Sequence, residues 1–160
     1  MKNLSKALAA AGMLAGAAAS PAHAEQEPFG EGFSGWRFTQ EALKDGGIDC
    51  RAILKRGKQE YIMAMLSDGD GYVSVNSPGL KGKFPNSRLN LAQGPVTVTA
   101  TASPERLVFS SLNEFTIDQI AQEGGYVWVL PKLDKSAEVD LGNRATDAIN
   151  RVYECIAANS

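Results

Sequence analysis

The chain has 160 residues, of which 44% are hydrophobic and 21% charged, and its formal net charge is −2. This length suits one ordinary domain with a hydrophobic core, and a net acidic protein with scattered basic residues gains little from nucleic-acid phosphates. The only histidine is His23, so the chain beyond it cannot form a Ser-His-Asp triad, a Cys-His pair or a histidine-ligated metal site.

The first 24 residues have the pattern of a secretory signal peptide. Lys2 and Lys6 give a positive start, an apolar stretch follows, and Ala22-His23-Ala24 supplies a small-x-small cleavage pattern. We therefore predict cleavage after Ala24 and a periplasmic or secreted location, with 14 basic and 18 acidic side chains remaining. The apolar stretch is too short to cross a bilayer, and no later stretch approaches about 18 apolar residues, so no membrane span is predicted.

The rest of the chain divides into a flexible leader over residues 25–32, which is polar with proline and glycine, and a single globular domain over residues 33–160. Most of the domain shows short apolar stretches, several with strand-like alternation, separated by turn signals such as the Asp-Gly pairs of residues 68–71. Residues 77–86 contain two prolines and two glycines and are predicted as a loop. The predicted strands cover residues 35–39, 48–54, 61–66, 72–75, 96–101, 107–109, 126–130 and 137–141.

Two later segments have a helical period. Thr116 and Gln119 fit the capping box of a short helix, which two glycines end at residues 124–125. Asn143 is predicted to cap a longer C-terminal helix. Its apolar stripe recurs at steps of three and four: Ala145, Ala148, Ile149, Val152, Cys155 and Ile156. We therefore expect a β-rich α+β fold, an antiparallel β-sandwich or open barrel with the short helix and the C-terminal helix packed on it.

The two cysteines, Cys50 and Cys155, predict a structural disulfide. An exported protein meets an oxidising compartment, and an even number of cysteines favours a bridge. The alternative is a reactive thiol, which needs a neighbour such as Arg51 to lower its pKa. A redox pair has close spacing in sequence, whereas these cysteines lie near opposite ends of the domain.

The predicted strands carry aromatic residues that either pack in the core or line a carbohydrate or peptide surface. The candidate binding surface consists of Trp36, Tyr72 and Trp128, with Pro78 in the predicted loop. The threonines at positions 97, 99 and 101 form an outward row, which on an edge strand could recruit another chain.

No metal or cofactor site is predicted. Asp68 and Asp70 suggest calcium, but a calcium loop needs a glutamate eleven residues after the first aspartate, where this chain has Gly79. A hairpin turn accounts for these residues better, because Asp-Gly is the pair that a tight turn requires.

Carboxylates could still support acid–base chemistry without histidine. Glu114 and Asp118 are four residues apart and could share a helix face, while Glu138 and Asp140 alternate and could share one face of a strand. The alternative is that these acids are solvated surface residues, which are common on an acidic protein.

Motifs at the two ends of the domain follow a recognisable order. Gly35-Trp36-Arg37 opens the first strand and Cys50 lies in the second. Near the C-terminus come a short helix, Gly124-Gly125, a strand, Val139-Asp140-Leu141-Gly142 and an alanine-bearing helix. This order resembles the invasion-associated locus B family of small secreted or periplasmic bacterial proteins. The resemblance implies a β-rich secreted domain linked to host-cell invasion, with no catalytic residues to transfer.

These observations predict a non-enzymatic, disulfide-bonded domain that binds a protein partner at the bacterial cell envelope. Two alternatives stay open. One is a carboxylate-based hydrolase acting on envelope glycan, which would need two acids converging in one cleft. The other is a secreted inhibitor or chaperone-like domain that presents an edge strand or the loop around residues 77–85.

Overall fold

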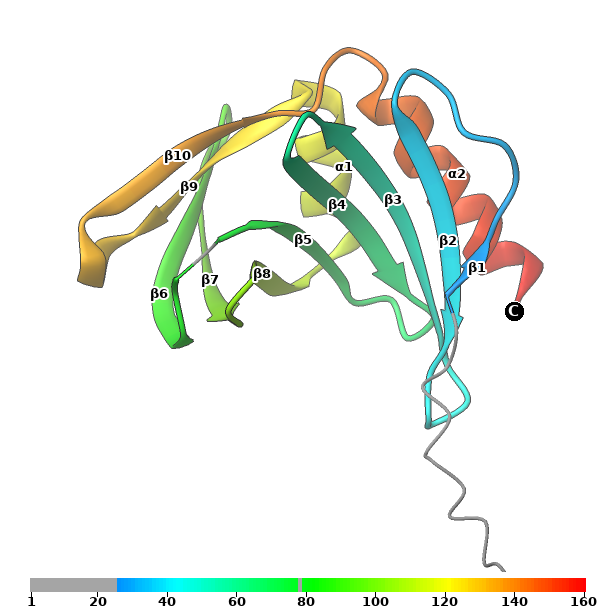
Figure 1. Ribbon diagram of the computed structural model, residues 1–160, viewed down its shortest axis with the longest axis horizontal. Helices are drawn as coiled ribbons and strands as arrows, with labels where there is room; N and C mark the ends of the chain where they lie inside the picture. The colour runs from blue at the N-terminus through cyan, green and yellow to red at the C-terminus, as the bar shows by residue number, and fades with distance from the viewer. Residues whose placement is uncertain (1–25, 78) are drawn as a thin grey trace, which may run out of the picture.

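The computed structural model describes residues 26–77 and 79–160. The predicted signal peptide and Pro78 lie outside these residues. The described chain forms the strands and helices shown in Figure 1. The strands are β1 (Glu27–Pro28), β2 (Trp36–Ala42), β3 (Ile48–Arg56), β4 (Gln59–Leu66), β5 (Gly71–Asn76), β6 (Gly82–Leu91), β7 (Gly94–Ala102), β8 (Arg106–Leu112), β9 (Gly125–Leu130) and β10 (Lys135–Asp140). The helices are α1 (Glu114–Glu123), the 3-10 helix η1 (Pro131–Leu133) and α2 (Ala145–Ala158).

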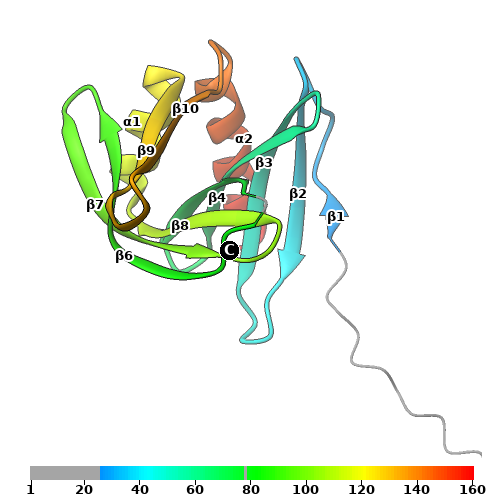
Figure 2. The same ribbon diagram turned by 60° about the vertical axis from the view of Figure 1, so that its left-hand side comes forward.

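All ten strands belong to one antiparallel sheet with the order β1-β2-β3-β4-β5-β8-β7-β6-β9-β10. The sheet curves strongly (Figure 1), and Figure 2 shows both α-helices between the arm with β2 and β3 and the arm with β6 and β7. Helix α2 packs against β3 and β4, and α1 packs against β9 and β5. The first and last strands of this order do not pair with each other, so the sheet is not closed. The predicted β-rich fold with two packed helices is confirmed, and it takes the open-barrel form.

The inner face of the sheet and the two α-helices enclose one hydrophobic core. The alternation predicted for β7 is present, because Val98 and Ala100 are buried while Thr97 and Thr99 are exposed. The predicted apolar stripe of α2 is buried against β3 and β4. Burial of one Ile or Val side chain contributes about 1.5–3 kcal/mol, so this stripe holds α2 on the sheet. None of the helices in the described residues is long and apolar enough to cross a membrane.

A disulfide joins Cys50 of β3 to Cys155 of α2, as predicted, with the two Cα atoms 6.1 Å apart. The exposed fractions of these residues are 0% and 2%, so the bond lies within the core. Neither cysteine is a free thiol. The covalent link therefore fastens the C-terminal helix to a strand near the start of the domain.

The caps of both helices differ from the prediction. In α1 the N-cap is Asn113, whose side chain accepts the Thr116 N–H at 2.9 Å, so Thr116 lies inside the first turn and is not the cap. The predicted stop at Gly124 is confirmed, since this residue is a left-handed C-cap with φ 69°. In α2 the cap position belongs to Arg144 and not to Asn143, and no side chain caps this end.

The loop predicted over residues 77–86 is wrong in its second half, because β6 already begins at Gly82. The second proline of this segment, Pro85, lies in β6 where the register with β7 shifts, between Phe84 and Ser87. Proline is tolerated at such a bulge because it has no N–H to donate to the ladder. The leader predicted over residues 25–32 likewise contributes β1, which pairs with β2.

The strand at the other end of the order, β10, forms an open edge of the sheet. All six of its residues pair with β9 in unbroken register. No other strand of the described residues pairs with it. Lys135, Glu138 and Asp140 are exposed along this edge, while Val139 is buried.

Candidate functional site

The aromatic residues of the predicted binding surface lie on opposite faces of the sheet. Trp36 is only 3% exposed and belongs to the core. Trp128 is half-buried on the inner face and packs against Phe109, with ring centroids 6.4 Å apart. Tyr72 lies on the outer face, among charged side chains, and Pro78 is outside the described residues. The three described aromatics therefore form no common surface, because successive strand residues alternate between faces.

The outer face carries a cavity of about 370 Å³ over β2, β3, β4, β5 and β8. Paired residues of antiparallel strands point to the same face, so the register places one row of lining residues across the sheet. The row consists of Arg37, Ile53, Ile62, Ser74 and Val108. The floor of the cavity is therefore largely apolar, and charged side chains stand on both sides of it.

One side of the floor holds an acidic cluster, formed by Glu41, Asp49, Arg51 and Tyr72. Arg51 Nη2 donates to Asp49 Oδ2 at 2.6 Å and to Glu41 Oε2 at 2.7 Å. Its Nε donates a hydrogen bond to the Tyr72 hydroxyl oxygen at 2.7 Å. The Tyr72 hydroxyl in turn donates to Asp49 Oδ2 at 2.9 Å. Two carboxylates face one guanidinium, so the acidic cluster has a formal charge of −1 at neutral pH.

Burial and charge together fix the protonation states in this cluster. Burial opposes the charge of Arg51, but the hydrogen bond with Asp49 and the surrounding negative groups outweigh it and raise the pKa of Arg51. Burial is also the largest cause that raises the pKa of Tyr72, and the charge of Asp49 adds to it. At neutral pH Arg51 is therefore a cation, and Tyr72 is a neutral hydroxyl held in place by Asp49.

The other side of the floor holds a basic cluster, formed by Arg37, Glu60 and Arg106. The Glu60 carboxylate accepts from Arg37 Nη2 at 2.9 Å and from Arg106 Nη1 at 3.2 Å. Arg106 Nε also donates to the hydroxyl of Ser74 at 2.7 Å. Burial lowers the pKa of Arg106, with Glu60 opposing the shift, and a guanidinium nonetheless stays protonated in proteins. Two guanidiniums face one carboxylate, so the basic cluster has a formal charge of +1.

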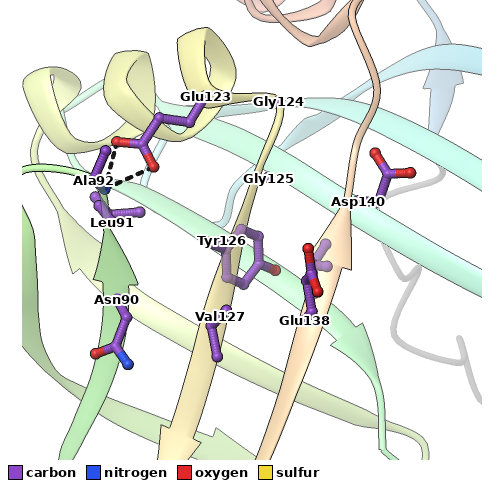
Figure 3. A pocket seen from close by; sticks show the side chains of 11 residues that line it. Asn90, Leu91, Ala92, Glu123, Gly124, Gly125, Tyr126, Val127, Glu138 and Asp140 are labelled. Carbon is purple, nitrogen blue, oxygen red and sulfur yellow. Dashed lines mark hydrogen bonds between the residues drawn. The ribbon is translucent and has the colours of Figure 1, made fainter.

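A second cavity, of about 450 Å³, lies where β6 and β9 separate (Figure 3). The two strands pair only as far as Asn90 and Val127. Beyond this point the Glu123 carboxylate, at the end of α1, accepts the Ala92 N–H at 2.9 Å with each oxygen. Tyr126 also lines the cavity, but its hydroxyl is buried and has no hydrogen-bond partner among the described residues.

The carboxylate pairs predicted for a hydrolase differ in their surroundings. Glu138 and Asp140 line the second cavity together. Asp140 is bound by Arg56 at 2.9 Å, and this hydrogen bond, followed by that of the Gly142 N–H, lowers the pKa of its carboxyl. Asp140 therefore stays ionised at neutral pH and cannot serve as a general acid.

The other carboxylate pair lies on α1. Glu114 is exposed in its first turn, while Asp118 accepts a hydrogen bond from the Tyr153 hydroxyl of α2 at 2.6 Å. Neither residue lines the two cavities described above. Asp118 therefore ties α1 to α2, and the pair shares neither of these cavities.

Asp68 and Asp70 lie in the turn between β4 and β5, as the hairpin interpretation predicts, and the Asp68 carboxylate accepts the Asp70 N–H at 3.0 Å. Over residues 26–77 and 79–160, no group of three or more His, Cys, Asp and Glu side chains is arranged to hold a metal ion.

The sequence analysis did not predict the outer-face cavity. Of the residues that line this cavity, the predicted binding surface included only Tyr72. A signal for it exists in β3, where Asp49 and Arg51 alternate with buried apolar residues. Charges in such positions are typical of a solvated strand face, yet here Asp49 is only 4% exposed. On the other side of the cavity, Glu60 and Arg106 meet only through the strand order, and no local pattern in the sequence indicates this contact.

The fold and the cavity together define an open, disulfide-linked antiparallel β-sheet protein with a charged cavity on the outer face of its sheet. No family model, curated protein or solved structure matches this chain.

Proposed function

We propose that the protein is an exported binding protein of the bacterial cell envelope, and that it holds its partner in the outer-face cavity without catalysing a reaction. The observation that carries this proposal is the cavity itself, in which ionised side chains are fixed by their neighbours. Asp49 and Ser74 are 4% and 1% exposed, although the outer face contributes little to the core. Burying a charge is costly unless it is paired, so such a network favours a fixed shape over added stability.

The disulfide supports the cellular location in this proposal. Structural disulfides form and persist in oxidising compartments such as the bacterial periplasm. The N-terminal signal peptide pattern, with cleavage after Ala24, is the proposed route of export. Recovery of the full-length gene product from the periplasmic fraction, with Glu25 as its N-terminal residue, is the expected result; an uncleaved cytosolic product would contradict export.

Kinship with the invasion-associated locus B family is part of the same proposal. It is supported by the order of β2 with its tryptophan, β3 with its cysteine, and the closing series α1, β9, β10 and α2. Under this proposal the partner belongs to the envelope of the bacterium or to the host surface that it meets.

A cavity-filling variant tests the binding function. Ile62 is half-buried in the cavity floor, so Ile62→Trp should block the cavity, whereas Thr97→Trp introduces the same side chain at an exposed outer-face position away from it. Each protein is incubated with a bacterial envelope extract and examined by native mass spectrometry. We expect the mass of a complex with a bound component of the extract for the wild type and for Thr97→Trp, and only the mass of the free protein for Ile62→Trp. A bound mass that persists on Ile62→Trp, or none on the wild type, would contradict the proposal.

A carboxylate-based hydrolase is the second candidate, because Glu138 and Asp140 share the cavity between β6 and β9. Residues two apart on a strand lie about 7 Å from each other, within the range of glycosidase carboxylates. Since Arg56 keeps Asp140 ionised, Glu138 would have to be the acid. Release of sugar from envelope glycan that stops in Glu138→Gln would favour this candidate; absence of release by the wild type would remove it.

A further inference from the structure

We infer that the outer-face cavity takes a short peptide with a free amino end and a free carboxylate end. This inference rests on the proposed function and names the chemical class of its ligand. The acidic cluster and the basic cluster carry formal charges of −1 and +1 and stand on opposite sides of one apolar floor. A ligand that matches both has a positive end, a negative end and apolar groups between them.

The available hydrogen-bonding groups support this orientation. At the basic cluster, the Arg37 side chain is 53% exposed, and its only hydrogen bond within the described residues is the one to Glu60. Its remaining N–H groups can bind a carboxylate in the bidentate manner that guanidinium geometry favours. At the acidic cluster, Glu41 lies just beyond the cavity lining, paired in register with the lining residue Asp49. It uses one oxygen to accept from Arg51, so its other oxygen can accept from an ammonium group at that end of the cavity.

The spacing of the clusters selects a peptide over a single amino acid. The groups that would hold the two ends of the ligand are Arg37 and Glu41, which lie on the same face of β2. They are four residues apart, a separation of about 13 Å along a strand. An extended peptide spans at most about 3.3–3.6 Å per residue, so about four residues are needed to reach from one cluster to the other. The ammonium and carboxylate groups of one amino acid are too close together for that.

Simpler ligands fit this cavity less well. An inorganic anion can use the remaining N–H groups of Arg37, and a simple cation can use the second oxygen of Glu41, but each would contact one cluster alone. The apolar floor between the clusters, with Ile53 and Ile62, offers neither of them a contact. Only a molecule that touches both clusters and the floor uses the whole cavity.

Calorimetric titration of the full chain with the peptide Ala-Leu-Leu-Ala tests this inference. The probes are the free peptide, the same peptide acetylated at its amino end, the peptide amidated at its carboxylate end, and free leucine. We expect saturable binding of the free peptide, at least about tenfold weaker binding when either end is blocked, and no binding of leucine at the same concentration. Equal binding of free and blocked peptides would overturn the inference.

Variants locate the two ends of the peptide. Arg37→Gln should weaken the free peptide about tenfold and abolish the discrimination between carboxylate and amide ends. Lys58→Gln, at an exposed position in the turn after β3, removes the same charge away from the cavity and should change nothing. Equal effects of the two variants would show that only net charge matters and would overturn the assignment of Arg37.

The outcome separates this inference from the proposed function. If Ala-Leu-Leu-Ala does not bind, while the wild type still binds a component of the envelope extract that Ile62→Trp does not bind, the cavity takes another class of ligand and only the peptide inference fails. If the wild type binds nothing from either source, the proposed function fails as well.

Discussion

Removal of the disulfide should cost the protein a large part of its stability. The bond closes a loop between residues 105 positions apart, for which the chain-entropy relation gives about 4.8 kcal/mol at 25 °C. A domain has about 5–15 kcal/mol of stability in total. The variant Cys50→Ala/Cys155→Ala should therefore fold only marginally, because its denatured chain regains the freedom that the bond had removed.

Urea unfolding of the variant, the oxidised wild type and the reduced wild type measures this effect. Reduction removes only the cross-link, whereas the double variant also removes two buried sulfur atoms. The difference in unfolding free energy between the reduced wild type and the variant therefore measures the packing contribution of the sulfur atoms. The m-value should rise in both, because the denatured chain without a cross-link is more open. A double variant within about 1 kcal/mol of the oxidised wild type would refute the cross-link reasoning.

Three further substitutions test individual contacts. Tyr126→Phe should leave the unfolding free energy unchanged or raise it by about 1 kcal/mol, since the buried hydroxyl has no partner in the described chain. Tyr153→Phe should lower it by about 0.5–1.5 kcal/mol, because it loses the hydrogen bond to Asp118. A larger loss in Tyr126→Phe than in Tyr153→Phe, measured by the same urea unfolding, would contradict both assignments. Asp140→Asn tests the pH dependence: Arg56 lowers the folded pKa of Asp140, so this pair stabilises the protein fully above about pH 3.9, and the effect is lost as the pH falls through the lowered folded pKa. The variant should be less stable than the wild type at about pH 7, and the difference should shrink as the pH falls toward about 2; an unchanged difference would contradict this.

Local patterns in the sequence predicted the regular elements wherever burial alone determines them. The alternation in β7 and the apolar stripe of α2 each reflect one buried face, so they are visible without knowledge of the fold. The disulfide followed from cysteine number and compartment. The start of α1 was placed too late because Thr116 and Asn113 are both good capping residues, and only the backbone geometry selects Asn113.

The candidate site depends on contacts that no local pattern contains. Arg106 and Glu60 are 46 residues apart in sequence. They meet because β8 pairs with β5, which places β8 only two strands from β4. The sequence cannot supply this strand order, since several orders would bury the same apolar faces. The start of β6 could not be predicted for a related reason. Pro85 argues against a strand, and the bulge that accommodates it exists only in the pairing of β6 with β7.

The charged edge of β10 has a consequence for the behaviour of the protein at high concentration. An uncovered strand edge is a template on which another molecule can add strands, and repeated addition leads to fibres. On β10, Lys135, Glu138 and Asp140 stand along that edge, so an incoming copy would have to desolvate ionised groups before any backbone hydrogen bond could form. The cost of desolvating these charged side chains should keep the molecules from associating through β10 at high concentration, although the open sheet leaves this edge uncovered.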